Sequence, residues 1–433
     1  MIDFSFTEEH YRFRNEARRF AKKTVLPLTL QADIMPDPMR AFQLMLPAYQ
    51  EAHRLGFATG FFPEGLGGLG VSNVGLQIIA EEICAVDPGF ACILLVNGLA
   101  LKPVEWFGND DQQRRFIEPL CTDPNHVMIA GWVVSEPAGT ACFDDPNPYP
   151  AGIKTTAVAG LHLGVPGFFL NGQKLWPSSA AGWDGKGADF NTVLVRTEPK
   201  RGGADFALSL AVVVRGTPGV SYDFILDKWG QRSNQNGLST YENVFVPAEN
   251  MLAFGQGDLV VSKAFTWSGP VAGIAAVGAC RSIYEAALSF AKGWTGGGSK
   301  TIMEHQIVGY TLGDVAMDIE AARYLCWKAA HYLDRWDAEG QAFGAFAKVW
   351  ATETMHRAAF KCMQVVGVNA IDRRQPFDRL YRELTTLPLY DAGNLGMQRR
   401  KIWGVMKHPS YDPQAFVENR AVPFSRDMEG AGL

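Results

Sequence analysis

Cysteine is scarce in this chain, and the few cysteines form no recognisable pattern. The seven among 433 residues are scattered, and none belongs to a Cys-x-x-Cys pair. That distribution is typical of a reducing compartment and indicates no metal site. Long apolar runs are missing too: no stretch reaches 18 residues, and the start MIDFSFTEEH has neither the basic nor the apolar region of a signal peptide. We therefore expect a cytoplasmic protein without a metal ion or a membrane-spanning helix.

Charge is likewise limited and slightly negative. Charged residues make up 20% and apolar residues 47% of the chain, proportions that fit a globular protein and exclude a disordered one. A net charge of −5, with an isoelectric point near 5.9, argues against nucleic acid and anionic membranes as partners. At 433 residues the chain exceeds one ordinary hydrophobic core, so two or three domains are expected.

The pattern of apolar residues divides the chain into three parts. Residues 1–126 show helical spacing, residues 127–250 alternate short β-branched runs with turn residues, and residues 251–433 return to long helical patterns. We predict an α+β fold with an N-terminal helical domain, a central β domain and a C-terminal helical bundle at these boundaries.

A glycine-rich run at residues 65–70 formally matches the G-x-G-x-x-G pattern of dinucleotide-binding folds. Pro63 and Glu64 precede it, and no strand–helix–strand unit surrounds it, so we reject the dinucleotide interpretation. We expect a loop here, followed by a helix that Ser72 caps.

Two short patches of the central part have the composition of a binding cradle. Residues 132–141 (WVVSEPAGTA) and 171–179 (NGQKLWPSS) each run from apolar or alternating residues into hydroxyls, Gly and Pro, as a strand ending in a tight loop does. Together they offer backbone N–H groups, hydroxyls and an aromatic wall, which suit a flat heterocycle with one polar edge. The alternative is two half-buried strands that simply end in turns.

Asp391 is a candidate for acid–base chemistry. It ends an apolar run and is followed by small residues in the sequence PLYDAGNLG, residues 388–396. Such a carboxylate can be held in a dry pocket with an adjusted pKa, and proton abstraction from carbon needs a base within hydrogen-bond reach. The residues alone equally allow Asp391 to cap a helix that begins near Asn394.

Together these motifs resemble the acyl-CoA dehydrogenase superfamily, and within it the nitroalkane oxidase branch. The resemblance is carried by the two patches, by a Val-Pro-x-x-Asn exit at residues 246–250, and by Arg382-Glu383 and Tyr390 at fixed offsets before Asp391. It covers nearly the whole chain. It implies an N-terminal helical domain, a central β-barrel domain and a C-terminal four-helix bundle.

The same resemblance implies FAD as the cofactor and assigns roles to individual residues. Asp391 would be the catalytic base, with Ser268 near the base and the flavin; for Ser268 the alternative is a helix N-cap two residues before Pro270. Ser178 matches the position whose hydroxyl approaches flavin N5, and Trp176 would lie against the ring. The implied cofactor-binding residues are Val134, Ser135, Gly139, Thr140, Trp176 and Ser178 around the ring, Gly297, Ser299, His305 and Gln306 near the pyrophosphate, Gln364 and Gly367 from a neighbouring subunit, and Asn394 beside the base.

Two positions depart from the family pattern. Gly296 stands where the family has an arginine that binds the pyrophosphate, and Gln398 stands where an arginine seven residues after the base supports it. After a shift of one residue, Arg399 would supply the second charge. Weaker FAD affinity and an altered substrate pocket are therefore open alternatives.

The resemblance implies an oxidoreductase that removes a proton α to an electron-withdrawing group of a small molecule and oxidises it through FAD. In a nitroalkane oxidase the products are an aldehyde or ketone and nitrite, and O₂ reoxidises the flavin. One alternative is an α,β-dehydrogenase of an acyl thioester or secondary metabolite, served by an electron-transfer partner. Another is a degenerate, non-catalytic member of the family, suggested by Gly296. The resemblance also implies a homotetramer, while the substrate itself cannot be read from generically apolar pocket walls.

Overall fold

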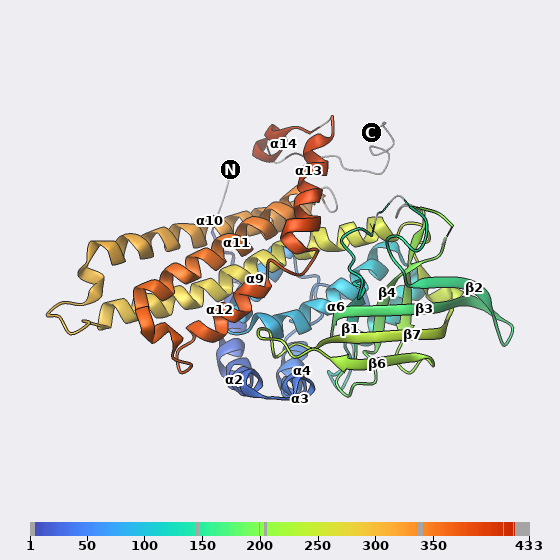
Figure 1. Ribbon diagram of the computed structural model, residues 1–433, viewed down its shortest axis with the longest axis horizontal. Helices are drawn as coiled ribbons and strands as arrows, with labels where there is room; N and C mark the ends of the chain where they lie inside the picture. The colour runs from blue at the N-terminus through green and yellow to red at the C-terminus, as the bar shows by residue number, and fades with distance from the viewer. Residues whose placement is uncertain are drawn as a thin grey trace.

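The computed structural model describes residues 5–143, 145, 147–198, 200–202, 206–336, 341–409, 411–418 and 420. Its elements follow the predicted order of helices, strands and helices again. In Figure 1 the strands lie together at one end, and the long C-terminal helices extend away from them as a bundle. The described strands span residues 130–252, and on this basis we propose domains at residues 1–126, 127–250 and 251–433.

The N-terminal helices pack against both the sheet and the bundle, α6 on β1 and α5 on α9. They are α1 (Glu8–Phe20), α2 (Leu26–Ile34), α3 (Pro38–Gln43), α4 (Leu46–Arg54), α5 (Asn73–Cys84), α6 (Pro88–Phe107), α7 (Asp110–Phe116) and α8 (Glu118–Cys121). The glycine-rich run passes from a 3₁₀ turn, Glu64–Leu66, into an irregular loop, as predicted. Ser72 then caps α5, because its Oγ accepts the Gly75 N–H at 3.0 Å.

The strands of the described chain form one mixed eight-stranded sheet. They are β1 (Ala130–Val133), β2 (Thr156–His162), β3 (Val165–Ser178), β4 (Phe190–Arg196), β5 (Leu208–Val214), β6 (Val220–Ile225), β7 (Asn236–Pro247) and β8 (Met251–Leu252). Their order is β6–β7–β3–β2–β4–β5–β8, with β1 added parallel to β4. The predicted barrel is thus an open sheet, because its two edge strands, β6 and β8, do not pair with each other within the described residues.

The ladder between β3 and β7 is irregular at the end that carries the second patch. Its register shifts between Leu175 and Ser178, and Trp176 adopts a left-handed φ of 78°. Such a conformation costs a bulky residue about 1–3 kcal/mol and persists only where the surroundings enforce it. The bulge leaves Trp176 53% exposed at the end of an otherwise paired strand.

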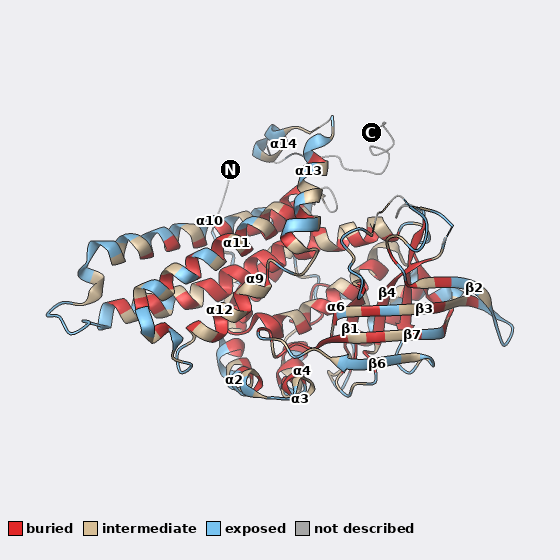
Figure 2. Cartoon of the chain, viewed as in Figure 1, coloured by how far each residue is buried: buried red, intermediate tan, exposed pale blue. Residues whose placement is uncertain are grey.

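The C-terminal helices form the predicted four-helix bundle, followed by two shorter helices. They are α9 (Gly257–Gly293), α10 (Gln306–Trp336), α11 (Gln341–Val366), α12 (Phe377–Thr386), α13 (Arg399–Lys407) and α14 (Pro413–Glu418). Figure 2 shows that α9 is buried along most of its length. Glycines permit this packing: a Cβ on Gly269 would come within 2.7 Å of the Gly344 carbonyl oxygen, and one on Gly344 within 2.6 Å of the Thr266 carbonyl oxygen. Helices α9 and α11 therefore meet backbone to backbone.

Among the described residues, α6 and α9 are long and apolar enough to match a membrane span by length and hydropathy alone. In their most apolar windows, however, 61% and 67% of the residues are buried inside the protein. Burial of that extent is typical of core helices, so neither helix supports a membrane span.

Candidate active site

Glu136 fixes the first patch to the second. Its carboxylate accepts the N–H groups of Lys154 at 2.8 Å and Thr155 at 2.9 Å, the Thr155 hydroxyl at 2.7 Å and Lys174 Nζ at 2.9 Å. The ion pair is fully buried, and Lys174 also donates to the Val134 carbonyl at 3.0 Å. Burial alone would raise the pKa of Glu136, but Lys174 and the N–H donors outweigh it and lower that pKa. Glu136 is therefore a structural anion.

The turn after Glu136 brings the predicted ring-binding residues of the first patch together. Thr140 Oγ1 accepts the Glu136 N–H at 3.0 Å, and the Gly139 N–H donates to the Glu136 carbonyl at 2.9 Å, with Gly139 at a φ of 91°. Ser135 joins the second patch, because its carbonyl accepts the Leu175 N–H at 3.0 Å. Within the described chain, the backbone N–H groups of Ser135 and Thr140 have no protein acceptor. They are free to bind a polar edge.

Ser178 is held with its hydroxyl proton available. Its Oγ accepts Asn234 Nδ2 at 3.1 Å and Asn236 Nδ2 at 3.2 Å, so both lone pairs are used and the O–H must donate elsewhere. Lys228 fixes both asparagines by donating to Asn236 Oδ1 at 2.5 Å and to the Asn234 carbonyl at 2.8 Å. Asn236 also binds the Trp176 carbonyl at 2.7 Å. Sequence reasoning missed this supporting loop, for which the two asparagines in close succession are a weak signal.

Asp391 lies in a strained turn between α12 and the π-helix at Gly393–Gln398, with φ values of 52° for Asp391 and 66° for Ala392. Its Oδ1 accepts the Ser268 hydroxyl at 2.6 Å. Its Oδ2 is buried and has no partner among the described residues. Burial raises the pKa of Asp391, against the opposing effects of Lys348, the Ser268 hydroxyl and Lys401.

Both structural alternatives for these residues are wrong. The helical segment after Asp391 begins at Gly393, its N-cap residue is Ala392, and no side chain caps it, so Asp391 is not an N-cap. Ser268 lies inside α9, as does Pro270, and it therefore caps nothing. The structure instead brings the predicted catalytic pair together, although the two residues are 123 positions apart.

The residues after Asp391 are arranged differently from our expectation. Arg399 does not support the base, because both its terminal nitrogens bind the Glu353 carboxylate, at 2.7 and 2.9 Å. Gln398 Nε2 donates to the Asp391 carbonyl at 3.1 Å. Two lysines that sequence reasoning missed, Lys348 and Lys401, lower the pKa of Asp391. Burial lowers the pKa of Lys348 to about 8 and that of Lys401 to about 7, and in both the Asp391 carboxylate opposes the shift.

Asn394 was expected among the cofactor-binding residues, and its side chain is engaged elsewhere. Its Nδ2 donates to Thr352 Oγ1 at 2.8 Å and to Glu353 Oε1 at 3.2 Å, and its Oδ1 accepts Lys348 Nζ at 2.9 Å. With both amide hydrogens used inside the bundle, this side chain has no donor left for FAD. In this structure the side chain fixes the turn that carries Asp391, and the placement of Asn394 in the cofactor site stays a prediction.

Tyr390 is fixed from the side of α6. Its hydroxyl accepts Gln231 Nε2 at 2.8 Å and lies 3.5 Å from Cys92 Sγ. The Gln231 N–H in turn donates to Glu383 at 2.7 Å, and burial raises the pKa of Glu383 to about 8. The Glu383 and Tyr390 positions of the sequence motif thus form a scaffold for the turn at Asp391.

The remaining predicted cofactor-binding residues lie at the far end of the bundle. All of them are exposed: Gly297, Ser299, His305, Gln306, Gln364 and Gly367. In Figure 1 this end, where α9 leads into α10 and α11 ends, points away from the sheet. Ser268 and Gly293 are 25 positions apart in α9, which corresponds to roughly 37 Å at a rise of about 1.5 Å per residue. Within one chain, the structure does not bring these residues to Asp391 and the cradle.

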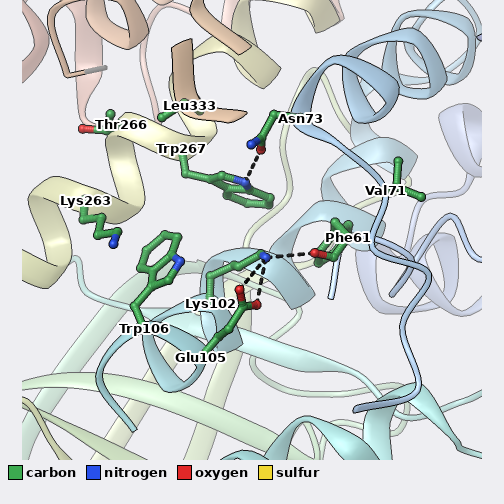
Figure 3. Close-up of a pocket in the computed structure, with 10 residues that line it drawn as sticks. All are labelled: Phe61, Val71, Asn73, Lys102, Glu105, Trp106, Lys263, Thr266, Trp267 and Leu333. Carbon is green, nitrogen blue, oxygen red and sulfur yellow. Dashed lines mark hydrogen bonds and ion pairs between the residues drawn. The ribbon is translucent and has the colours of Figure 1, made fainter. Parts of the chain in front are cut away.

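A cavity of about 170 Å³ lies beside α6 and α9 (Figure 3). Its charged walls have partners: Lys102 Nζ is 2.8 Å from Glu105, and Lys263 Nζ lies 4.7 Å from the centre of a ring of Trp106. Thr266, two residues before Ser268, lines it. None of the predicted site residues does so, and the cavity is distinct from the candidate active site.

The cradle has the groups that a flavin requires. Trp176 offers an exposed aromatic face, Ser178 an uncommitted O–H, and Ser135 and Thr140 free N–H groups. An apolar ring with one polar edge would stack on Trp176 and accept hydrogen bonds from the hydroxyl and the N–H groups. The residues present therefore fit FAD. No group of three or more potential metal ligands occurs in the described part of the chain.

Comparison with known proteins agrees with this site. Family models of the acyl-CoA dehydrogenase N-terminal and C-terminal domains match residues 7–123 and 255–406. The nitroalkane oxidase of Fusarium oxysporum is 32% identical over 96% of this chain and 97% of its own length. A cyclohex-1-ene-1-carbonyl-CoA dehydrogenase of Geobacter metallireducens is 25% identical over 90% and 95%. The chain therefore belongs to the acyl-CoA dehydrogenase superfamily, and it is an FAD-dependent oxidoreductase.

Solved structures point to the same branch of the superfamily. A nitroalkane oxidase structure superposes with a TM-score of 0.91 at 29% identity, covering 96% of this chain and 100% of the other. Butyryl-CoA dehydrogenase of Megasphaera elsdenii has a TM-score of 0.82 at 24% identity, covers 94% of this chain, and shows the shared fold alone. Active-site variants of nitroalkane oxidase have been solved with an aspartate changed to asparagine and with a serine changed to alanine.

Proposed function

We propose that this protein is a nitroalkane oxidase, which converts a nitroalkane to an aldehyde or ketone and nitrite. The observation that carries the proposal is the Ser268–Asp391 pair, in which one carboxylate oxygen accepts the serine hydroxyl and the other is buried without a partner among the residues that the structure describes. An aspartate and a serine are also the active-site residues varied in the nitroalkane oxidase structures.

Asp391 is assigned the role of the base. Ser268 orients the carboxylate through Oδ1, so Oδ2 is left to accept the proton from the carbon next to the nitro group. Because burial raises the pKa of Asp391, its carboxylate is a stronger base than one in water. Lys348 and Lys401 oppose that rise and favour the ionised form that can accept a proton.

The cofactor is held by groups of the cradle. Ser135, Thr140, Trp176 and Ser178 would hold the flavin ring, with the Ser178 hydroxyl donating to N5. FAD supplies the oxidation by accepting electrons from the deprotonated substrate, and O₂ is the final acceptor. The chain's donors at the polar edge of the ring would stabilise negative charge there.

A second copy of the chain is assigned the other half of the FAD site. At the far end of the bundle, Gln306, Gln364 and Gly367 are exposed. The length of α9 separates this end from the cradle, so these residues do not reach the cradle of their own chain. We place them against the pyrophosphate and adenine of a neighbouring subunit in a homotetramer. The assembly is cytoplasmic in this proposal, in keeping with the scattered free cysteines.

A second candidate is an α,β-dehydrogenase of an acyl thioester that uses an electron-transfer partner. Gln398 favours it, because it departs from the arginine of nitroalkane oxidase, and acyl-CoA dehydrogenases are among the relatives. A third, a non-catalytic member, would have no use for the free Ser178 hydroxyl or the unpartnered Asp391 oxygen.

The deciding experiment is anaerobic flavin reduction by the purified, FAD-loaded protein. A simple nitroalkane should bleach the flavin, and in air it should release nitrite with consumption of O₂. An acyl-CoA should leave the flavin oxidised. Bleaching by acyl-CoA with formation of an enoyl product would establish the second candidate, and a protein that retains no flavin would establish the third.

A further inference from the structure

Gln398 stands where nitroalkane oxidase carries an arginine, seven residues after its active-site aspartate. The Gln398 side chain turns to the backbone of Asp391, and its Oε1 has no partner in the part of the chain that the structure describes. The next residue, Arg399, is bound by both terminal nitrogens to Glu353. Neither position brings a positive charge to the Asp391 carboxylate.

Lys401 lies one helical turn beyond Gln398, on the same side of α13. Its ammonium is held against α9, where Nζ donates to the Ser262 carbonyl at 3.0 Å and to Thr266 Oγ1. Both acceptors are uncharged. The carboxylate whose field acts on Lys401 is that of Asp391, which raises the pKa of this lysine against the lowering effect of burial. Lys401 is thus a partly enclosed amine, anchored by neutral groups one helical turn from the Gln398 side chain that contacts Asp391. Burial lowers its pKa to about 7, so it carries its charge on the acidic side of that value.

Lys348 on α11 also acts on the Asp391 carboxylate and lowers its pKa more than Lys401 does. It donates as well to Asn394 Oδ1 at 2.9 Å, in the network that fixes the turn, and it lies on a different helix from the missing arginine. On α6, Cys92 is kept as a thiol, because burial raises its pKa to about 11. Burial likewise raises the pKa of Tyr390 and keeps it neutral. Among the described residues, the cations that lower the pKa of Asp391 are Lys348 and Lys401.

We propose that Lys401 is a positioning residue that supplies, from α13 and in place of the missing arginine, a positive charge that favours the ionised form of Asp391. This inference rests on the proposed function, in which Asp391 is the base. The chain has thus moved the cation by one turn of helix, from position 398 to position 401. The Gln398 amide retains a contact with the Asp391 backbone.

The test compares Lys401→Gln with the double variant Gln398→Arg/Lys401→Gln, which returns the charge to the position used by nitroalkane oxidase. Lys407→Gln is the matched control, an exposed lysine in the last turn of the same helix. The rate of flavin reduction by a neutral nitroalkane is measured against pH. Loss of a nearby opposite charge should shift the acidic side of the pH–rate profile of Lys401→Gln upward by about one pH unit, which is a roughly tenfold loss of rate at acidic pH. The double variant should recover the wild-type profile, and Lys407→Gln should keep it.

A second readout does not depend on turnover. The infrared band of the protonated Asp391 carboxyl, identified by its loss in Asp391→Asn, should titrate at higher pH in Lys401→Gln than in the wild type. Reduction by a preformed nitronate anion should be unchanged, because that substrate needs no base. An unmoved infrared titration in Lys401→Gln overturns the inference. If that variant fails to fold, Gln398→Arg in the wild-type background is measured instead. The added cation should lower the pH at which the Asp391 carboxyl titrates, and an unchanged titration overturns the proposal. Failure of the wild type to oxidise nitroalkanes would contradict the proposed function, whereas the infrared titration would still test the role of Lys401.

Discussion

Glu136 and Asp391 are two carboxylates of the candidate site, and their surroundings differ in almost every respect. Glu136 accepts four hydrogen bonds, one of them from a buried lysine, and its pKa is lowered. Asp391 accepts one side-chain hydrogen bond, keeps one oxygen without a partner among the described residues, and its pKa is raised. The hydrogen-bonding capacity of the Glu136 carboxylate is used, whereas that of the Asp391 carboxylate is only partly used.

The difference shows how a buried acid is assigned to structure or to chemistry. A saturated carboxylate has no capacity left for a substrate proton, and removing it exposes its partner's charge to an apolar interior. An unsaturated one costs stability but can act as a base. The strained φ of Asp391 points the same way, because such strain is concentrated at functional sites.

Asp391→Asn should have the largest effect, because it keeps the shape of the side chain and removes its ability to accept a proton. Flavin reduction by a neutral nitroalkane should fall by about 10²–10⁴-fold, the contribution of a positioned general base. A nitronate anion should still reduce the flavin, because its proton has already been removed. Stopped-flow reduction with the two substrate forms measures both. Full activity on the neutral form would show that Asp391 is not the base.

Glu136→Gln should act on stability instead. With Lys174 left unpaired, the free energy of unfolding at neutral pH should fall by about 3 kcal/mol, as for a broken buried ion pair. Because the folded-state pKa of Glu136 is lowered, its contribution is present above the unfolded-state pKa and is lost as pH falls. Urea unfolding at neutral and acidic pH should therefore show the two proteins converging in acid. Glu242→Gln, an exposed residue of the same sheet, is the control and should be neutral. An equally neutral Glu136→Gln would contradict the structural role.

Ser178→Ala removes a hydroxyl donor from the cradle. The loss of one donor to a charged state should slow flavin reduction by roughly one to two orders of magnitude, equivalent to about 1.5–3 kcal/mol. FAD content should remain nearly unchanged, because Lys228 still holds Asn234 and Asn236, and Asn236 still binds the Trp176 carbonyl. Pre-steady-state reduction and the protein-bound flavin spectrum test this. Complete loss of flavin would mean that Ser178 is structural, like Glu136.

Gly296→Arg should have the smallest effect. An arginine beside the pyrophosphate would add about 1.5–3 kcal/mol of binding. Gly296 has a φ of 60°, however, where a side chain costs about 1–2 kcal/mol. The FAD dissociation constant should therefore tighten only several-fold, with a slightly lower Tm. Fluorescence titration of apoprotein with FAD gives the constant, and an unchanged or weaker value would count against this placement of the pyrophosphate.

The parts of the fold that follow from local chemistry could be predicted from the sequence. The Ser72 cap, the irregular glycine run and the turn at Asp391 depend on a few neighbouring residues, and each is found where the residues indicated. The support of Ser178 could not be predicted, because Asn234 and Asn236 reach it from almost 60 residues away.

The lysines around Asp391 escaped prediction for another reason. In a helical pattern a lysine normally marks the solvent-facing side, yet Lys348 is fully buried and the ammonium of Lys401 is turned against α9. Arg399 looked like the better candidate because it is adjacent in sequence to the missing arginine. Only the three-dimensional position of Glu353 shows that its charge is already used.

The placement of cradle and distal segment at opposite ends of the bundle has a genetic consequence. In the proposed tetramer, each chain gives its cradle to one site and its distal segment to another. A chain with Asp391→Asn still has a sound distal segment, and a chain altered at Gln364 and Gly367 still has a sound cradle. Neither forms a working site alone. Co-assembled, the second chain's cradle would meet the first chain's distal segment, and two inactive proteins would complement each other.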